Sequence, residues 1–256
     1  MKRLEITRFQ PLDYACSEAI NTLCTNLSFS GAGVKRILVT SCESSEGKTF
    51  LSMNMMRTFA SLGKRVVLVD ADLRRSLIGA KYGLRFPEGK NTGLAPYLAG
   101  MVGMEEILYE TGIPGAYIVP VGREVSNSLS LLNTPRFGQL LDRLAAQADF
   151  VLVDAPPTGV IIDAAEIARY CDGTLLAVKY NAISRRELME VKRQLEMTGC
   201  PILGAVLNSV EMDSYSSKKY YYKSYYYHKG DNYYTPAKKE EPQAKKPARK
   251  GTAAKS

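Results

Sequence analysis

The chain has 256 residues, which suits one α/β domain of about 210 residues followed by a tail. Its net charge of +8 lies in the tail, because residues 218–256 hold eleven Lys or Arg against three acidic residues and the remainder is balanced. The balanced remainder argues against a nucleic-acid-binding domain, and the basic tail is expected to solubilise the chain or to contact an anionic membrane surface or partner.

An amphipathic helix comes first in the chain, because Ile20, Leu23, Cys24 and Leu27 follow helical spacing. This helix is expected either to pack on its own domain or to dock on a neighbouring molecule. From residue 36 onward, short apolar runs alternate with longer helical patterns, which predicts a mainly parallel sheet covered on both faces. The predicted strands are 36–41, 65–70, 116–121, 150–154, 173–178 and 202–208, and the predicted helices are 48–62, 135–147, 163–170 and 185–198.

A phosphate-binding loop is predicted at residues 41–49, directly after a strand and at the start of the helix 48–62. Backbone N–H groups at a helix N-terminus face an anion, and the helix dipole adds positive potential. We expect Lys48 to bridge the β- and γ-phosphates and the Thr49 hydroxyl to bind magnesium, although Cys42 stands where the strict motif has its first glycine. The predicted nucleotide-binding residues are Ser44, Ser45, Glu46, Gly47, Lys48, Thr49, Phe50 and Asn208, and the predicted buried face of the helix is Phe50, Leu51, Met55, Phe59 and Leu62.

Three aspartates stand at the ends of predicted strands, where ligands of parallel sheets bind. Asp70 and Asp72 follow one strand, and Asp154 ends another, at the Walker B position that holds magnesium directly or through water. With Gly47-Lys48-Thr49 they predict a Mg-ATP site in an α/β, three-layer P-loop NTPase fold. Because a protonated tyrosine hydroxyl is a poor nucleophile, a carboxylate should lie beside an acceptor tyrosine, and either Asp70 or Asp72 could serve as base or magnesium ligand.

The C-terminal part is dominated by tyrosine. After Val210 the apolar periodicity stops, which predicts a disordered Tyr/Lys-rich tail, and nine of the sixteen tyrosines fall within residues 215–234. An ATP site and many tyrosine hydroxyls on one chain suggest a kinase that phosphorylates its own tail; the alternative is an aromatic low-complexity tail without this role. The predicted organisation is an N-terminal segment and helix (1–34), an ATP-binding kinase domain (35–212), a tyrosine cluster (213–234) and a basic tail (235–256). The candidate phosphorylation sites are Tyr215, Tyr220, Tyr221, Tyr222, Tyr225, Tyr226, Tyr227, Tyr233 and Tyr234.

These motifs resemble the bacterial tyrosine kinases of capsular and exopolysaccharide synthesis, which are relatives of the MinD/ParA-like P-loop ATPases. The resemblance covers about residues 14–234. Its specific parts are the string Asp-Ala-Asp-Leu-Arg-Arg at 70–75 and the tyrosine cluster. More widely shared parts are Glu-Gly-Lys-Thr at 46–49, Asn-Thr-Gly-Leu at 91–94, Val-Asp-Ala-Pro-Pro at 153–157, Asp-Ala at 163–164 and Gly-Ala-Val-Leu-Asn at 204–208.

The resemblance implies a cytoplasmic kinase that uses ATP and Mg²⁺, with catalytic roles for Lys48, Asp70 and Asp72 and magnesium roles for Thr49, Asp70, Asp72 and Asp154. It implies a transmembrane activator similar to polysaccharide co-polymerases, which recruits the chain to the inner face of the membrane and completes the site. A cognate phosphotyrosine phosphatase and transphosphorylation within a ring of subunits are implied as well. Five cysteines without C-x-x-C spacing argue against disulfides or zinc and fit a reducing cytoplasm, and we expect neither a signal peptide nor a membrane span.

The sequence departs from the family at three places. Ser44-Ser45 replace Pro-Gly in the loop, which predicts weaker nucleotide binding if a glycine conformation is needed there. Glu43 replaces the signature lysine of the partitioning ATPases, which favours the kinase branch. Asn21 and Cys24 replace the two arginines used for ring assembly, so a ring must be absent or held differently. Two rival functions remain open, a catalytically weak nucleotide-binding scaffold and a partitioning ATPase that binds DNA or membrane.

Overall fold

The computed structural model describes residues 2–31, 33–87, 91–123, 125, 127–159 and 162–210. The chain divides into two units, residues 1–210 and 211–256, and the tyrosine cluster and basic tail belong to the second unit, outside the described residues. No helix in the described part is long and apolar enough to cross a membrane.

An eight-stranded sheet forms the centre of the described unit, in the order β1-β6-β7-β4-β8-β3-β9-β10. Its neighbouring strands run parallel except for the antiparallel pair β6–β7, so the predicted mainly parallel sheet is confirmed. β2 (Glu5–Ile6) and β5 (Leu84–Arg85) form a separate antiparallel ribbon. The strands of the main sheet are β1 (Lys2–Arg3), β3 (Arg36–Ser41), β4 (Val66–Asp70), β6 (Tyr109–Glu110), β7 (Ala116–Val119), β8 (Phe150–Asp154), β9 (Gly173–Lys179) and β10 (Ile202–Asn208).

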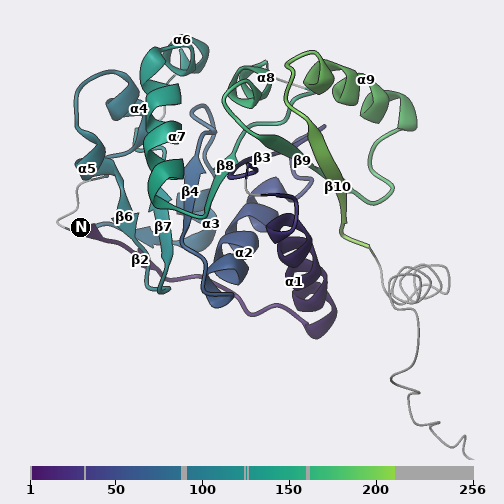
Figure 1. Cartoon of the computed structure of the whole chain (residues 1–256), viewed down its shortest axis with the longest axis horizontal. Helices are drawn as coiled ribbons and strands as arrows, with labels where there is room; N and C mark the ends of the chain where they lie inside the picture. The colour runs from purple at the N-terminus through teal and green to yellow at the C-terminus, as the bar shows by residue number, and fades with distance from the viewer. Residues whose placement is uncertain are drawn as a thin grey trace, which may run out of the picture. The chain divides into compact units, whose positions relative to one another are not determined.

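Helices cover both faces of this sheet, which gives the predicted three layers (Figure 1). Successive strand residues alternate between two apolar clusters, because side chains along a strand point to opposite faces. On β3, for example, Ile37 and Val39 join the cluster under α1 and α2, whereas Leu38 joins the cluster under α7 and α8. The helices are α1 (Tyr14–Ser28), α2 (Lys48–Ser61), α3 (Ile78–Tyr82), α4 (Leu94–Leu98), α5 (Met104–Ile107), α6 (Ser128–Leu132), α7 (Pro135–Gln147), α8 (Asp163–Ala168) and α9 (Arg185–Glu196).

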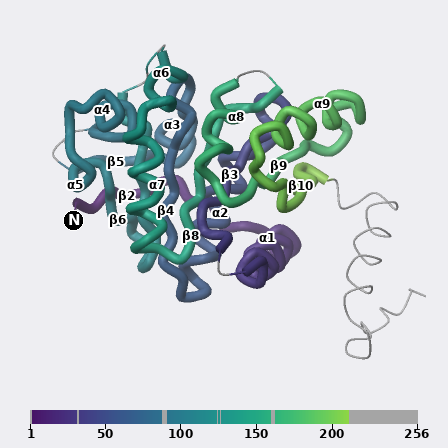
Figure 2. Tube along the Cα trace, turned by 45° about the horizontal axis from the view of Figure 1, so that its top comes forward, coloured from purple at the N-terminus to yellow at the C-terminus, as the bar shows by residue number. Residues whose placement is uncertain are grey.

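The first helix packs on its own domain. Asp13 caps α1 by accepting a hydrogen bond from the Cys16 N–H, and Ile20, Cys24 and Leu27 are buried among apolar residues of α2 and the sheet. Figures 1 and 2 both show α1 lying alongside α2. Of the two roles expected for this helix, the structure therefore confirms internal packing.

The predicted buried face of α2 is partly wrong. Leu51, Met55 and Phe59 are buried, but Phe50 and Leu62 are 37% and 47% exposed. Met53 and Met56 are fully buried instead, because α2 is enclosed by the sheet on one side and by α1 on the other. A helix covered from two directions has no single apolar stripe, so helical spacing could not identify its buried residues.

Candidate nucleotide-binding site

The phosphate-binding loop leaves the middle of the sheet, where β3 is paired with β8 and β9. It connects Ser41 to the first residue of α2, Lys48, and Gly47 occupies the N-cap of the helix with φ of 95°. A Cβ at Gly47 would lie 1.8 Å from Nδ2 of Asn208, so both the backbone angle and the available space require glycine. The loop therefore presents the N-terminus of α2 at the carboxyl edge of the sheet.

Glu46 and Asn208 hold this loop from within the domain. The Glu46 carboxylate is buried and accepts hydrogen bonds from the Glu43 N–H (2.7 Å) and from the Lys179 N–H at the end of β9 (3.1 Å). The Asn208 side-chain amide donates to the Glu46 carbonyl (2.9 Å) from the end of β10. Both residues were predicted to contact nucleotide, and their contacts within the chain shape the loop.

Ser44 and Ser45 replace the Pro-Gly pair expected in the loop, and both are exposed. Ser45 has φ of 66°, the left-handed conformation that favours glycine. The loop thus keeps a glycine-like turn at Ser45 despite its Cβ. Phe50, also predicted to bind nucleotide, lies one residue beyond Thr49, and its ring lines a separate pocket discussed below.

The acidic residues converge beneath the loop. Asp70 and Asp154 are direct neighbours in the β4–β8 register, so their buried carboxylates leave adjacent strand ends. The Lys48 ammonium lies 3.8 Å from the Asp72 carboxylate, and both side chains are buried. The structure therefore brings together five buried residues that were all predicted from the sequence, Lys48, Thr49, Asp70, Asp72 and Asp154. All except Asp72 stand at the ends of α2, β4 and β8.

Burial dominates the electrostatics of these carboxylates. It raises the pKa of Asp70 well above its ordinary value, and the neighbouring Asp154 raises it further. Burial also raises the pKa of Asp154 to about 6 and raises the pKa of Asp72, whereas the Lys48 charge acts in the opposite direction on both. Two adjacent buried carboxyl groups ionise together only when a cation lies near them.

One acceptor in this group has no partner. Oδ2 of Asp70 accepts a hydrogen bond from the Ser76 hydroxyl, but Oδ1 is buried without a partner among the described residues. Within that part of the chain, no three acidic, His or Cys side chains are arranged to hold a metal by themselves. Mg²⁺ usually takes one or two carboxylates and completes its shell with water and substrate phosphates, so the residues present fit a nucleotide-bound magnesium ion.

Several supporting residues have no role in the sequence-based prediction. The Ser52 hydroxyl in α2 lies within hydrogen-bond distance of two acceptors, an Asp154 oxygen (3.2 Å) and the Lys48 carbonyl (3.0 Å), which share its one proton. Arg74 forms a fork with the buried Asp163 carboxylate, with N···O distances of 2.9 and 3.1 Å, and Ser128 donates to the same carboxylate. The Arg74–Asp163 contact fastens the loop after β4 to α8, and the strings at 70–75 and 163–164 signalled this pair, whereas no motif signalled Ser52 or Ser128.

Comparison with known proteins agrees with this geometry. Residues 37–250 match the CobQ/CobB/MinD/ParA nucleotide binding domain family. The chain is 35% identical over 195 residues to the tyrosine-protein kinase CpsD of Streptococcus pneumoniae, covering 76% of this chain and 85% of that protein. The kinase domain of the Escherichia coli tyrosine kinase ETK superposes with a TM-score of 0.74 at 28% identity, over 81% of this chain and 83% of that one. The septum site-determining protein MinD of Pyrococcus horikoshii, solved with Mg-ADP, shares the fold with a TM-score of 0.59 at 23% identity, over 73% and 77% of the two chains.

Proposed function

The chain belongs to the CobQ/CobB/MinD/ParA nucleotide-binding family and within it to the bacterial tyrosine-protein kinases, and on this premise we propose that it transfers the γ-phosphoryl group of Mg-ATP to tyrosines of its own segment 215–234. The observation that carries the proposal is the buried group formed by Lys48 and the three aspartates beside the phosphate loop. A buried lysine at the start of α2 suits phosphate contact, and the tail supplies nine acceptor hydroxyls.

Each residue of the group has a proposed task. Backbone N–H groups of the loop and the Lys48 ammonium bind the phosphates and stabilise the charge that develops during transfer. Thr49, Asp70 and Asp154 hold Mg²⁺, which neutralises the phosphate oxygens when it is bound. Asp72 orients the acceptor tyrosine and takes up its proton, because it contacts Lys48 and is less deeply buried than Asp70.

We also propose the setting of this reaction. The relatives named as tyrosine-protein kinases suggest that the chain regulates capsular or exopolysaccharide synthesis or export. A transmembrane activator similar to polysaccharide co-polymerases would recruit it to the inner face of the membrane, and a phosphotyrosine phosphatase would reverse the modification. Each phosphotyrosine adds about −1.5 to −2 charges, so about five would cancel the +8 of the tail and all nine would reverse it.

The test is the intact mass of the purified chain after incubation with Mg-ATP, with and without the cytoplasmic tail of the candidate activator. We expect several phosphate-sized increments that map to residues 215–234, none in Lys48→Ala, and an unchanged pattern in the matched surface variant Lys64→Ala. If ATP binds but no increments form under either condition, the chain is a nucleotide-binding scaffold instead of a kinase.

A further inference from the structure

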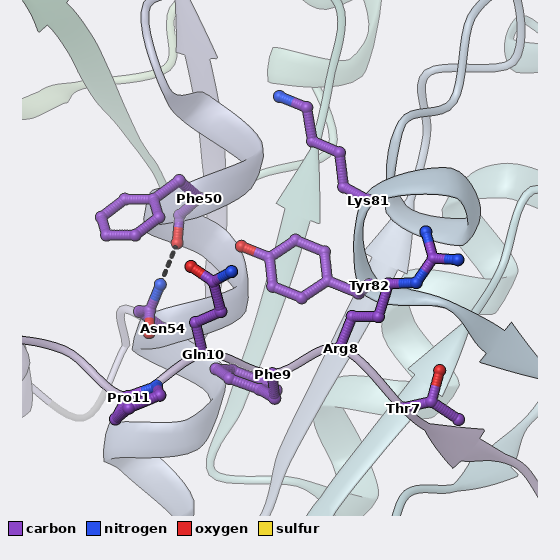
Figure 3. A pocket seen from close by; sticks show the side chains of 9 residues that line it. All are labelled: Thr7, Arg8, Phe9, Gln10, Pro11, Phe50, Asn54, Lys81 and Tyr82. Carbon is purple, nitrogen blue, oxygen red and sulfur yellow. Dashed lines mark hydrogen bonds between the residues drawn. The ribbon is translucent and has the colours of Figure 1, made fainter.

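A cavity of about 520 Å³ lies between the N-terminal segment, α2 and α3 (Figure 3). Its walls include none of the loop residues 42–49, so it is distinct from the candidate nucleotide site. It is nevertheless close in the chain, because Phe50 follows Thr49 directly. Residues 7–11, Phe50, Asn54, Lys81 and Tyr82 line it.

The walls are aromatic and held in place before any ligand arrives. Phe9 and Tyr82 pack with ring centroids 5.4 Å apart, and the Arg57 guanidinium lies 4.6 Å from the centre of the Phe9 ring. Phe50 adds a third ring from α2 and is partly exposed. Rings fixed in this way form a site for another flat apolar group without a large ordering cost.

One polar group in the cavity has no partner. Tyr82 is 8% exposed, and its hydroxyl, which makes no hydrogen bond with any described side chain or carbonyl, is open to the cavity and not sealed off like Oδ1 of Asp70. Figure 3 shows this hydroxyl pointing toward Gln10 and the first turns of α2. Burial raises the pKa of Tyr82 to about 12, so the hydroxyl keeps its proton and can donate to an acceptor. The Asn54 side-chain amide, which also lines the cavity, is held by the Phe50 carbonyl and by Arg57.

The charge of the lining is positive. Arg8 and Lys81 both line the cavity and are exposed, and the Arg8 guanidinium also donates to the Ala80 carbonyl (3.3 Å). Among the described residues, no acidic side chain lines the cavity. The acidic group that acts on Tyr82 is the buried Asp154, and Arg57 opposes it. An occupant that satisfies rings, a hydroxyl donor and two cations is an aromatic anion.

We propose that this cavity binds phosphotyrosine, in the sequence context of residues 215–234. The unmodified segment carries four lysines and one aspartate, so Arg8 and Lys81 repel it. Each phosphate adds about −1.5 to −2 charges to an aromatic ring and reverses that repulsion. The origin of the phosphotyrosine rests on the proposed kinase function, but the binding chemistry does not. The cavity would then recognise the product of the reaction beside the site that makes it.

The test is fluorescence anisotropy with synthetic peptides of residues 215–234, unmodified or carrying one phosphotyrosine at position 221. The protein is the full chain with Lys48→Ala, which prevents self-made phosphotyrosine from competing. We expect the phosphopeptide to bind at least about tenfold more tightly than the unmodified peptide. Tyr82→Phe should weaken it several-fold, and Arg8→Gln with Lys81→Gln at least about tenfold, whereas the surface control Arg143→Gln should change nothing.

Three outcomes would overturn this assignment. Equal binding of both peptides would show a pocket for aromatic residues alone. If the Tyr82→Phe variant and the double variant bind the phosphopeptide as tightly as the parent protein does, and melt at the same temperature, the phosphopeptide binds elsewhere. Full competition by inorganic phosphate at the same concentration would show a simple anion site. The phosphopeptide is synthetic, so the binding assay does not depend on the chain's own kinase activity. A negative binding assay therefore does not test the kinase proposal, and a negative mass measurement does not change the binding result.

Discussion

Gly47→Ala tests whether the shape of the phosphate loop is coupled to β10. The added Cβ would lie 1.8 Å from Nδ2 of Asn208, so Asn208 must turn away and lose its 2.9 Å hydrogen bond to the Glu46 carbonyl. That loss costs about 1 kcal/mol. A φ of 95° for a residue with a Cβ adds about 1–2 kcal/mol. The total of about 2–3 kcal/mol corresponds to roughly 30- to 150-fold weaker nucleotide binding if ATP needs the present loop.

The assay is titration calorimetry with Mg-ATP, together with urea unfolding of the ligand-free protein. A double-mutant cycle with Asn208→Ala separates the two contributions, because Gly47→Ala in that background retains only the cost of the backbone angle. We therefore expect the two substitutions to be less than additive by about 1 kcal/mol in the free energy of unfolding. Strict additivity, or a neutral Gly47→Ala, would refute the coupling between the loop and β10.

Three further predictions concern single contacts. Ser45→Gly removes the left-handed backbone strain at this position. It should raise the free energy of unfolding by about 0.5–1 kcal/mol and tighten nucleotide binding. A variant that unfolds at lower urea concentration than the parent would contradict this. Asp172→Asn should lower the free energy of unfolding at neutral pH by about 1–3 kcal/mol. Burial acts to raise the pKa of Asp172, but hydrogen bonds from Arg36 and neighbouring amides outweigh it, so the folded pKa is lowered. This stabilisation is present above the unfolded pKa of about 3.9 and is lost as pH falls through the folded value, so the gap between variant and parent should close in acid; a constant gap would contradict it. Arg74→Lys keeps the charge but loses the fork to Asp163, and should lower both the melting temperature and the tail phosphorylation rate; an unchanged rate would show that this anchor is dispensable.

The sequence predicted the long elements well because their patterns are unambiguous. β3, β8, β10 and α7 begin and end at the predicted residues, where apolar runs or an amphipathic stripe stop at a turn signal. The short helices α3 to α6 were not predicted, because four or five residues do not complete an apolar period. Two-residue strands such as β1 carry no pattern at all, and only pairing with β6 defines them.

The features of the candidate site also differ in whether the sequence alone could predict them. Asp70 and Asp154 could be placed at strand ends from the sequence, but their direct pairing depends on β4 lying next to β8, which no local pattern encodes. Ser52 and Ser76 escaped notice because a serine within a helix or loop resembles any other until its partner is known. The cavity around Tyr82 depends on segments far apart in the chain.

The replacement of glycine by serine in the loop is too small a change to favour a scaffold over a kinase. Left-handed strain at Ser45 amounts to about 1–2 kcal/mol, or roughly five- to thirtyfold in affinity. Hydrogen bonds to two neighbouring strands hold the loop in this shape. The Glu46 carboxylate accepts a hydrogen bond from the Lys179 N–H of β9, and the Asn208 side chain at the end of β10 donates to the Glu46 carbonyl. Ser41 adds a contact within the loop, with its hydroxyl donating to the Glu43 carbonyl (2.6 Å). A loop held by several hydrogen bonds keeps its phosphate-facing geometry against strain of this size, so Ser45 tunes nucleotide affinity without abolishing it.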